Sequence, residues 1–154
     1  MRFFPQPLTR AESDAIAHRC TALIAERGWG FWAAELVETD TFIGMIGLHI
    51  PDAALPISPC VEIGWRLLPA YWGQGLATEG ARLALQYGFE VLHLPEIVAF
   101  TALPNLPSQA VMRRLGMQRD AHTFEHPNLP LHHPLRTHCL YRLQAEQFRA
   151  QSAS

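Results

Sequence analysis

The sequence contains no lysine: all 12 of its Lys and Arg residues are arginine. A Walker-type phosphate loop needs a lysine side chain, and Schiff-base and pyridoxal-phosphate enzymes need a lysine amine. The missing lysine therefore excludes these classes. Cysteine is scarce as well, since the chain has only Cys20, Cys60 and Cys139 and no CxxC pair. Three scattered thiols favour free cysteines in a reducing compartment over a disulfide framework.

Charge and long apolar runs are also in short supply. Charged residues make up 17% of the chain and the formal net charge is −2, so composition gives no reason to expect a nucleic-acid or membrane surface. The sequence shows neither a signal-peptide pattern nor an apolar segment of membrane-spanning length. We therefore expect a cytoplasmic protein. With 154 residues, 49% of them hydrophobic, the chain is long enough for one domain with a sizeable core.

Helix and strand signals alternate along the chain. Thr9 and Glu12 form a capping box that predicts a helix, and Gly28 is a natural stop for it. The other predicted elements are strands over 31–38, 42–50, 61–67, 97–103, 117–125 and 136–143, and helices over 78–92 and 107–116. This interleaving predicts an α/β or α+β sheet with some parallel pairing. We assign one domain to residues 1–146, followed by a polar tail over 147–154.

The strongest chemical signal is a glycine-bearing segment between a predicted strand and a predicted helix. Residues 72–79 read Trp-Gly-Gln-Gly-Leu-Ala-Thr-Glu. Glycines let a backbone approach an anion closely, and a helix N-terminus offers unpaired N–H groups and the positive end of the helix dipole. The segment is therefore a candidate pyrophosphate-binding loop that needs no lysine, and the alternative is an ordinary tight turn. It is not a dinucleotide-binding fingerprint, which would require glycine at Thr78.

This segment and the strand before it resemble the Gcn5-related N-acetyltransferase (GNAT) superfamily, in its ribosomal-protein N-acetyltransferase (RimJ/RimL-like) branch. The loop is similar to the acetyl-CoA pyrophosphate loop of the family at Gly75 and Ala77, with Trp72 in place of the usual Gln or Arg. Residues 61–65, Val-Glu-Ile-Gly-Trp, resemble the Glu-Ile-Gly-Tyr/Trp strand of that branch.

A third motif agrees with this resemblance. Residues 105–108 (Asn-Leu-Pro-Ser) and 114–117 (Arg-Leu-Gly-Met) resemble the Asn-x-x-Ser and Leu-Gly-Met/Phe pair of the same branch. The resemblance extends over residues 3–143. It implies a mixed, mostly antiparallel sheet flanked by helices, with a splayed central parallel pair. Residues 1–5 resemble a segment that normally follows a first strand and helix, so we expect the domain to lack those two elements.

The resemblance implies transfer of an acetyl group from acetyl-CoA to a primary amine by direct attack, without a metal. The acceptor would be a protein N-terminus or a small molecule, and homodimers are common in the family. The implied cofactor-binding groups are the backbone N–H groups of Gly73, Gln74, Gly75, Leu76 and Ala77, the Thr78 hydroxyl, the strand edge at Arg66 and Leu67, and the side chains of Asn105 and Ser108.

Two side chains are candidates for catalysis. Strand alternation puts Glu62, Gly64 and Arg66 on one face, and a carboxylate among apolar residues acquires a raised pKa suited to a general base. The alternative for Glu62 is an exposed strand residue or a partner for an arginine. Ser108 is a candidate for protonating the departing thiolate, with helix capping as its alternative. The usual tyrosine acid of the family aligns with Met112, which cannot donate a proton.

Four histidines gather near the C-terminus: His126, His132, His133 and His138. Prolines interrupt their spacing and no zinc pattern is present, so we expect this loop to be substrate-side or structural rather than a metal site. His138 is an alternative base.

An aromatic cluster near the N-terminus and two other functions stay open at this point. Trp29, Phe31 and Trp32 fit the core, a hairpin edge or an amine pocket. The chain could be a non-catalytic acyl-CoA sensor or a histidine-loop metal-binding module, and an enzyme of this kind could transfer another acyl group.

Overall fold

The computed structural model describes residues 9–153, so the segment 1–5 singled out above lies outside the described residues. Helix α1 (Arg10–Arg27) begins at the predicted capping box: Thr9 Oγ1 accepts from the Glu12 N–H, and the Glu12 carboxylate accepts from the Thr9 N–H. It ends at Gly28, which has φ 86° and donates its N–H to the Ile24 carbonyl. Both predicted helix limits are therefore confirmed.

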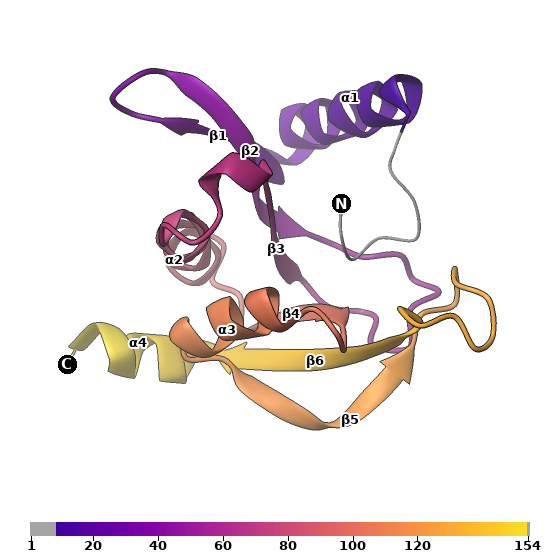
Figure 1. Ribbon diagram of the computed structural model, residues 1–154. Helices are drawn as coiled ribbons and strands as arrows, with labels where there is room; N and C mark the ends of the chain where they lie inside the picture. Colours follow the sequence, from indigo (N-terminus) through magenta and orange to yellow (C-terminus); the bar gives the residue numbers. More distant parts are fainter. Residues whose placement is uncertain (1–8, 154) are drawn as a thin grey trace.

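Six strands form one sheet in the order β1-β2-β3-β4-β6-β5 (Figure 1). Their bounds are β1 Phe31–Leu36, β2 Thr41–His49, β3 Glu62–Leu67, β4 Glu96–Ala102, β5 Gln118–Glu125 and β6 Thr137–Gln144. Neighbouring strands pair antiparallel except β3 and β4, which pair in parallel. The prediction of a mostly antiparallel sheet with a central parallel pair is confirmed.

Helices lie on both sides of this sheet. The short 3₁₀ helix η1 (Pro69–Tyr71) follows β3, and α2 (Leu76–Gln86) continues into a π-helical turn, η2 (Tyr87–Val91). Helix α3 (Leu106–Arg114) follows β4, and α4 (Ala145–Ala153) follows β6. Helices α1 and α2 lie on opposite sides of β2 and β3 (Figure 1). No helix within residues 9–153 has the length and apolar character needed to cross a bilayer.

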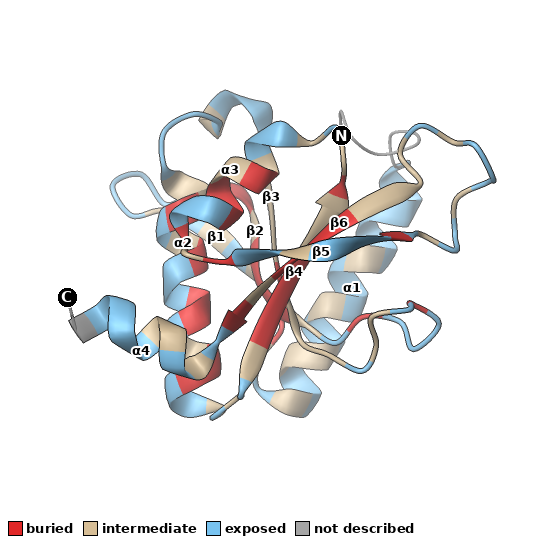
Figure 2. Cartoon of the chain, turned by 90° about the horizontal axis from the view of Figure 1, so that it is seen from below, coloured by how far each residue is buried: buried red, intermediate tan, exposed pale blue. Residues whose placement is uncertain are grey.

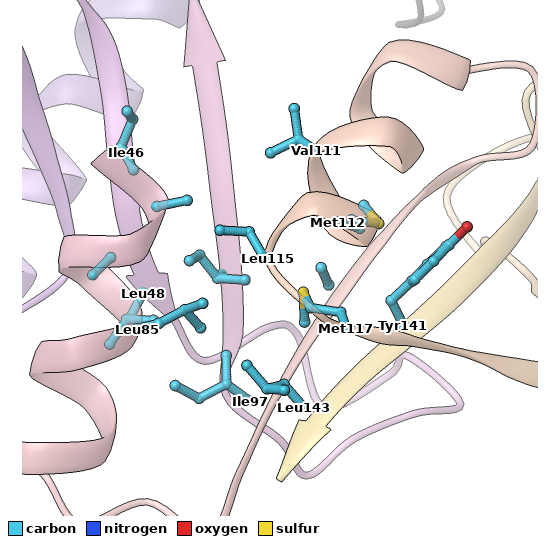
Figure 3. Close-up of a cluster of buried hydrophobic side chains, with 14 of the residues drawn as sticks. Ile46, Leu48, Leu85, Ile97, Val111, Met112, Leu115, Met117, Tyr141 and Leu143 are labelled. Carbon is cyan, nitrogen blue, oxygen red and sulfur yellow. The ribbon is translucent and has the colours of Figure 1, made fainter. Parts of the chain in front are cut away.

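The main core lies between the sheet and helices α2 and α3. Leu48 and Ile63 from the sheet pack there with Leu85 of α2 and Leu115 at the end of α3 (Figure 3). All four side chains are at most 2% exposed. Burial of apolar area on this scale is the main stabilising contribution to such a fold.

The opposite face of the sheet is more thinly covered. A smaller cluster there contains Val98 and Leu140 together with Leu55 from the loop between β2 and β3. Helix α1 has no buried residue, and Figure 2 shows it tan and blue along its length. This face therefore has room for a site.

Several element limits differ from the sequence prediction by one or two residues, and two of the differences have a clear physical reason. The helix predicted from Thr78 begins at Leu76, because the left-handed Gly75 serves as its N-cap. The polar residues after Glu146 are helical, since α4 runs through them, and the Phe148 ring packs against Phe89 at a centroid distance of 5.0 Å. Phe148 thus helps to anchor a stretch whose composition predicts a tail, together with the hydrogen bond from the Ala145 N–H to the Pro95 carbonyl at the start of α4.

Candidate active site

The loop between β3 and α2 contains two glycines whose backbone conformation favours glycine. Gly73 has φ 74° and Gly75 has φ 77°, both in the left-handed region. A Cβ added at either residue would meet no described atom within 4 Å. The glycines are therefore required by backbone conformation, and the space in front of them is open to a ligand.

Helix α2 begins at this loop, and no side chain caps the first backbone N–H groups of the helix. Its N-cap, Gly75, has no capping side chain, and the Glu79 N–H donates to the Gly75 carbonyl. The Thr78 side chain is 9% exposed, and within residues 9–153 its Oγ1 has no hydrogen-bond partner. Leaving a buried hydroxyl unpaired costs free energy. Free N–H groups, the helix dipole and this unpaired hydroxyl together fit a pyrophosphate group.

Two side chains of the loop bond back to the backbone that precedes them. Trp72 Nε1–H donates to the Leu67 carbonyl at 2.8 Å, and Gln74 Nε2 donates to the Ala70 carbonyl at 3.1 Å. Trp72 stands where the family motif has Gln or Arg, and it is 49% exposed. Both side chains therefore stabilise the loop, and the donors that remain for an anion are backbone N–H groups.

Strands β3 and β4 meet at one point of the sheet. Their ladder contains one residue pair, Glu62 with Val98, and the Val98 N–H donates to the Val61 carbonyl at 3.0 Å. Because the backbone groups of alternate residues point to opposite edges of a strand, those of Ile63, Trp65 and Leu67 face the gap between the two strands. The gap is an open strand edge of the kind that pairs with an extended ligand.

Arg66 and Leu67 were predicted to form one strand edge, but this alternation points their backbone groups to opposite sides of β3. The Arg66 carbonyl lies against Gly44 of β2, where an added Cβ would collide with it, so the Arg66 backbone faces β2. Leu67 faces the gap, and so does Trp65, which the sequence analysis did not name. The signal that could have found Trp65 is the same two-residue period, applied to backbone direction instead of side chains.

A cavity of about 480 Å³ lies beside the gap, on the thinly covered face of the sheet. Three predicted site residues line it: Glu62, Arg66 and Asn105. The predicted common face of Glu62 and Arg66 is therefore confirmed, and Ile63 between them lies in the main core on the other side. Another cavity, of about 430 Å³, lies beside α4 and contains none of the predicted residues.

Glu62 has the most strongly perturbed environment in this cavity. Burial raises the pKa of its carboxyl to about 8, well above the ordinary value. Among the described residues the carboxyl has no hydrogen-bond or ion-pair partner that would stabilise its charged form. A carboxyl group with such a pKa is a stronger base than an ordinary carboxylate and accepts a proton in the fraction that is ionised, which grows as the pH rises toward 8.

Asn105 and Ser108 lie at the start of α3, and their roles differ from each other. Asn105 is the N-cap: its Oδ1 accepts from the Ser108 N–H at 3.3 Å, and its Nδ2 donates to Thr101 Oγ1 at 2.9 Å. The capping alternative considered for Ser108 therefore belongs to Asn105. Ser108 is half-buried and is not among the described residues that line the cavity.

Met112, which aligns with the usual tyrosine acid of the family, lies in the core. Met112 is 2% exposed and packs in the main cluster near Tyr141 (Figure 3). The Tyr141 hydroxyl donates to Gln109 Oε1 at 3.0 Å and accepts from Arg113 at 3.2 Å. Neither residue supplies a proton donor to the cavity, because Met112 has none and the Tyr141 hydroxyl is engaged on the opposite side of the sheet.

The histidine-rich loop forms one end of the cavity. His126 and His138 line it, with ring centroids 5.1 Å apart, whereas His132 is exposed. Within the described residues, no three His, Cys, Asp or Glu side chains are placed to hold a metal ion. The arrangement fits the expected substrate-side loop.

The N-terminal aromatic cluster is divided between the two faces of the sheet. Phe31 lines the cavity, and its ring stacks on His49 at 5.2 Å. Trp32 points to the other face, where its ring meets Tyr87 edge-on at 5.3 Å. Of the three residues considered for an amine pocket, Phe31 is the one the structure brings to the site.

The geometry agrees with what comparison of the whole chain finds. The family model described as "Acetyltransferase (GNAT) domain" matches residues 1–118. The chain therefore belongs to the GNAT acetyltransferase family.

Individual relatives are similar over shorter stretches. The putative ribosomal N-acetyltransferase YdaF of Bacillus subtilis is 32% identical over 83 residues, which cover 54% of this chain and 44% of YdaF. The spermidine N(1)-acetyltransferase of Escherichia coli K12 is 42% identical over 48 residues, which cover 31% of this chain and 26% of that enzyme. The crystal structure of an acetyltransferase from Agrobacterium tumefaciens is 28% identical, with a TM-score of 0.70 over 90% of this chain and 74% of that chain. The aligned stretch spans from about a quarter to about half of the curated relatives.

Proposed function

We propose that this protein transfers an acetyl group from acetyl-CoA to a primary amine, on a protein N-terminus or a small molecule, as a cytoplasmic enzyme of the RimJ/RimL-like branch. One observation carries the proposal: the two ends of β3 lead to the two parts such a reaction needs. The cavity with the Glu62 carboxyl is at its start, and the uncapped N-terminus of α2 follows its end. The similarity to YdaF supports the choice of branch.

The residues that would hold acetyl-CoA are those of the loop and the open strand edge. The backbone N–H groups of residues 73–77 and the unpaired Thr78 hydroxyl would bind the pyrophosphate. The backbone of Trp65 and the N–H of Leu67, whose carbonyl already accepts from Trp72, would pair with the extended pantetheine arm, with Asn105 at the opposite side of the gap. Bound there, acetyl-CoA supplies an acetyl group activated as a thioester.

Glu62 would take the proton that an ammonium must lose before its nitrogen can attack, directly or through water. A backbone N–H of the β3 edge would donate to the acetyl carbonyl as negative charge develops on its oxygen. The new C–N bond then forms as the C–S bond breaks, and the proton that the acylated nitrogen loses passes to the departing thiolate. Ser108 remains our candidate for relaying that proton, since Met112 has no proton to give.

A non-catalytic acyl-CoA sensor is the second candidate function. The observation that favours it is the absence, within residues 9–153, of a proton donor at the usual position of the acid, where Met112 is buried in the core. A thiolate leaves without an acid more readily than an alkoxide does, so we rank the enzyme first.

Two measurements separate these functions. Acetyl-CoA is expected to raise the melting temperature of the purified protein, because a ligand that binds only the folded state stabilises it. Amines are then expected to cause release of free thiol. The amount of thiol should match the amount of acetylated amine measured by mass spectrometry. Stabilisation without thiol release across a broad amine panel would favour the sensor. Failure of every CoA ester to stabilise the protein would overturn both.

Thr78→Val is expected to weaken CoA binding about tenfold, because one hydrogen bond to a charged group is lost. The unliganded variant is expected to be at least as stable as the wild type, since valine removes a buried hydroxyl that has no partner. Calorimetric titration with CoA and thermal unfolding measure the two effects. In the matched control, Thr101→Val, stability should fall, because Thr101 Oγ1 accepts from Asn105. A loss of stability in Thr78→Val with unchanged CoA affinity would assign Thr78 a structural role.

A further inference from the structure

Aromatic rings form two walls of the cavity. On one side Phe100, His126 and His138 line the cavity, and His126 lies 5.1 Å from His138. The buried ring of Phe124 contacts Phe100 and His138, with the centroids of these three rings 5.4 to 6.3 Å apart. On the other side Phe31 lies over β3. Such rings offer faces and edges to a planar apolar group between them.

Phe31 reaches this position because Gly64 has no side chain. A Cβ added at Gly64 would lie 3.0 Å from Phe31 Cε1, so the ring covers the backbone of β3 closely. Phe31 is held there by stacking on His49. The wall is therefore built into the sheet and does not depend on a loop.

The cavity carries little negative charge. Among the described residues that line it, Glu62 has the one carboxylate and Arg66 has a guanidinium. Burial lowers the pKa of His138, and burial together with the nearby Arg136 lowers the pKa of His126, so the cavity favours the neutral form of both imidazoles. A second or third ammonium group on an acceptor would find no further carboxylate to pair with, and a buried charge without a partner is costly.

Neutral hydrogen-bonding groups occupy the end of the cavity away from Glu62. Glu62 is level with Val98 on β4, and His138 is level with Ala102, four residues further along the strand. That offset corresponds to about 13 Å. His138 Nδ1 donates to the Arg136 carbonyl at 3.1 Å, which leaves Nε2 as an acceptor.

From this arrangement, and resting on the proposed function, we infer that the acceptor is a monoamine with an aromatic body, and not a polyamine. Its single ammonium group lies toward Glu62, and its ring lies between Phe31 and Phe100. A free arylalkylamine and the first residue of a peptide with an N-terminal phenylalanine share this chemistry. The inference goes against the substrate named for the spermidine N(1)-acetyltransferase relative, which carries more than one positive charge.

The experiment compares kcat/KM for three acceptors with the full chain and saturating acetyl-CoA: 2-phenylethylamine, a dipeptide amide beginning with phenylalanine, and spermidine. The kcat/KM of at least one of the two aromatic amines is expected to exceed that of spermidine about tenfold or more. The aromatic acceptor with the higher kcat/KM shows whether the ring belongs to a free amine or to a peptide N-terminus. A kcat/KM for spermidine equal to or above both would overturn the inference while leaving the N-acetyltransferase proposal intact. Bound CoA with no thiol release from any amine would overturn the proposed function, and this inference with it.

A variant tests the wall itself. Phe100→Leu is expected to lower kcat/KM for the preferred aromatic amine about tenfold, because contact with the ring is lost. The same variant should lower kcat/KM for n-butylamine, which has no ring, much less, and should leave the dissociation constant of CoA unchanged. The matched control is Phe42→Leu, since Phe42 is 52% exposed on β2 and outside the cavity, and it should change none of these quantities. Equal losses for aromatic and aliphatic amines in Phe100→Leu would show a structural effect and overturn the assignment.

Discussion

Glu62→Gln is expected to lower kcat for amine acetylation about 10²- to 10⁴-fold, the usual contribution of a positioned general base. The dissociation constant of CoA should not change, because Glu62 lies at the opposite end of β3 from the pyrophosphate loop. Glutamine keeps the size and polarity of the side chain, so the variant isolates the loss of proton acceptance. Thiol release under saturating substrates and calorimetric titration with CoA measure the two quantities.

The pH dependence gives this prediction a second signature. Burial raises the pKa of Glu62 to about 8, so the carboxyl is mostly protonated at pH 7 and becomes an effective base as the pH rises. The wild-type rate should therefore climb through pH 8 and level off above it. Among the described residues, the titratable groups beside Glu62 include Arg66 on the same face, His49, which pairs with Glu62 across β2 and β3, and the Cys60 thiol. In Glu62→Gln this rise should be absent, and an unchanged profile would remove Glu62 from the mechanism.

Unfolding supplies a control that does not involve the reaction. Because the folded state binds the Glu62 proton more tightly than the unfolded chain does, the contribution of Glu62 to the free energy of unfolding should fall as pH rises from about 5 to about 8. The buried histidines, whose lowered pKa acts in the opposite direction, are the same in the wild type and the variant. Glutamine does not titrate, so Glu62→Gln should lose less stability over that range. A wild type and variant with parallel stability curves would mean that the pKa of Glu62 is not raised.

Local signals in the sequence predicted much of this fold. The capping box at Thr9 and Glu12 and the stop at Gly28 depend on neighbouring residues, and each is observed where it is expected. The two-residue period of β3 likewise predicted that Glu62 and Arg66 share one face. These features need no knowledge of the rest of the chain.

Other parts of the site depend on contacts that no local pattern encodes. Phe31 and Phe100 are far apart in sequence and come to one cavity because β1 and β4 lie in the same sheet. The single pairing of β3 with β4 at Glu62 opens the strand edge. The resemblance to the family predicted a splayed parallel pair, and no local pattern predicted the residue at which the two strands meet. The polar residues after Glu146 also depend on a distant contact. They form a helix in which Phe148 packs against Phe89, and their composition does not reveal this contact.

Gly75→Trp is expected to weaken CoA binding at least about a hundredfold. The space in front of Gly75 is open, and an indole there would occupy the approach to the first N–H groups of α2. Losing two hydrogen bonds to a charged phosphate accounts for an effect of that order. Calorimetric titration with CoA measures it directly, and thermal unfolding with and without CoA checks the same loss through the ligand-induced rise in melting temperature.

Gly28→Trp is the matched control for this substitution. Gly28 also has a left-handed backbone, with φ 86° against 77° at Gly75, and a Cβ there also meets open space. Both variants should therefore lose a similar amount of stability, about 1 to 2 kcal/mol, from forcing a side chain into that conformation. Only Gly75→Trp should lose CoA affinity. Because Gly28 and Gly75 share this backbone conformation, strain cannot explain a difference in CoA affinity between the two variants. Equal CoA affinity in the two variants would mean that the loop between β3 and α2 does not bind the pyrophosphate.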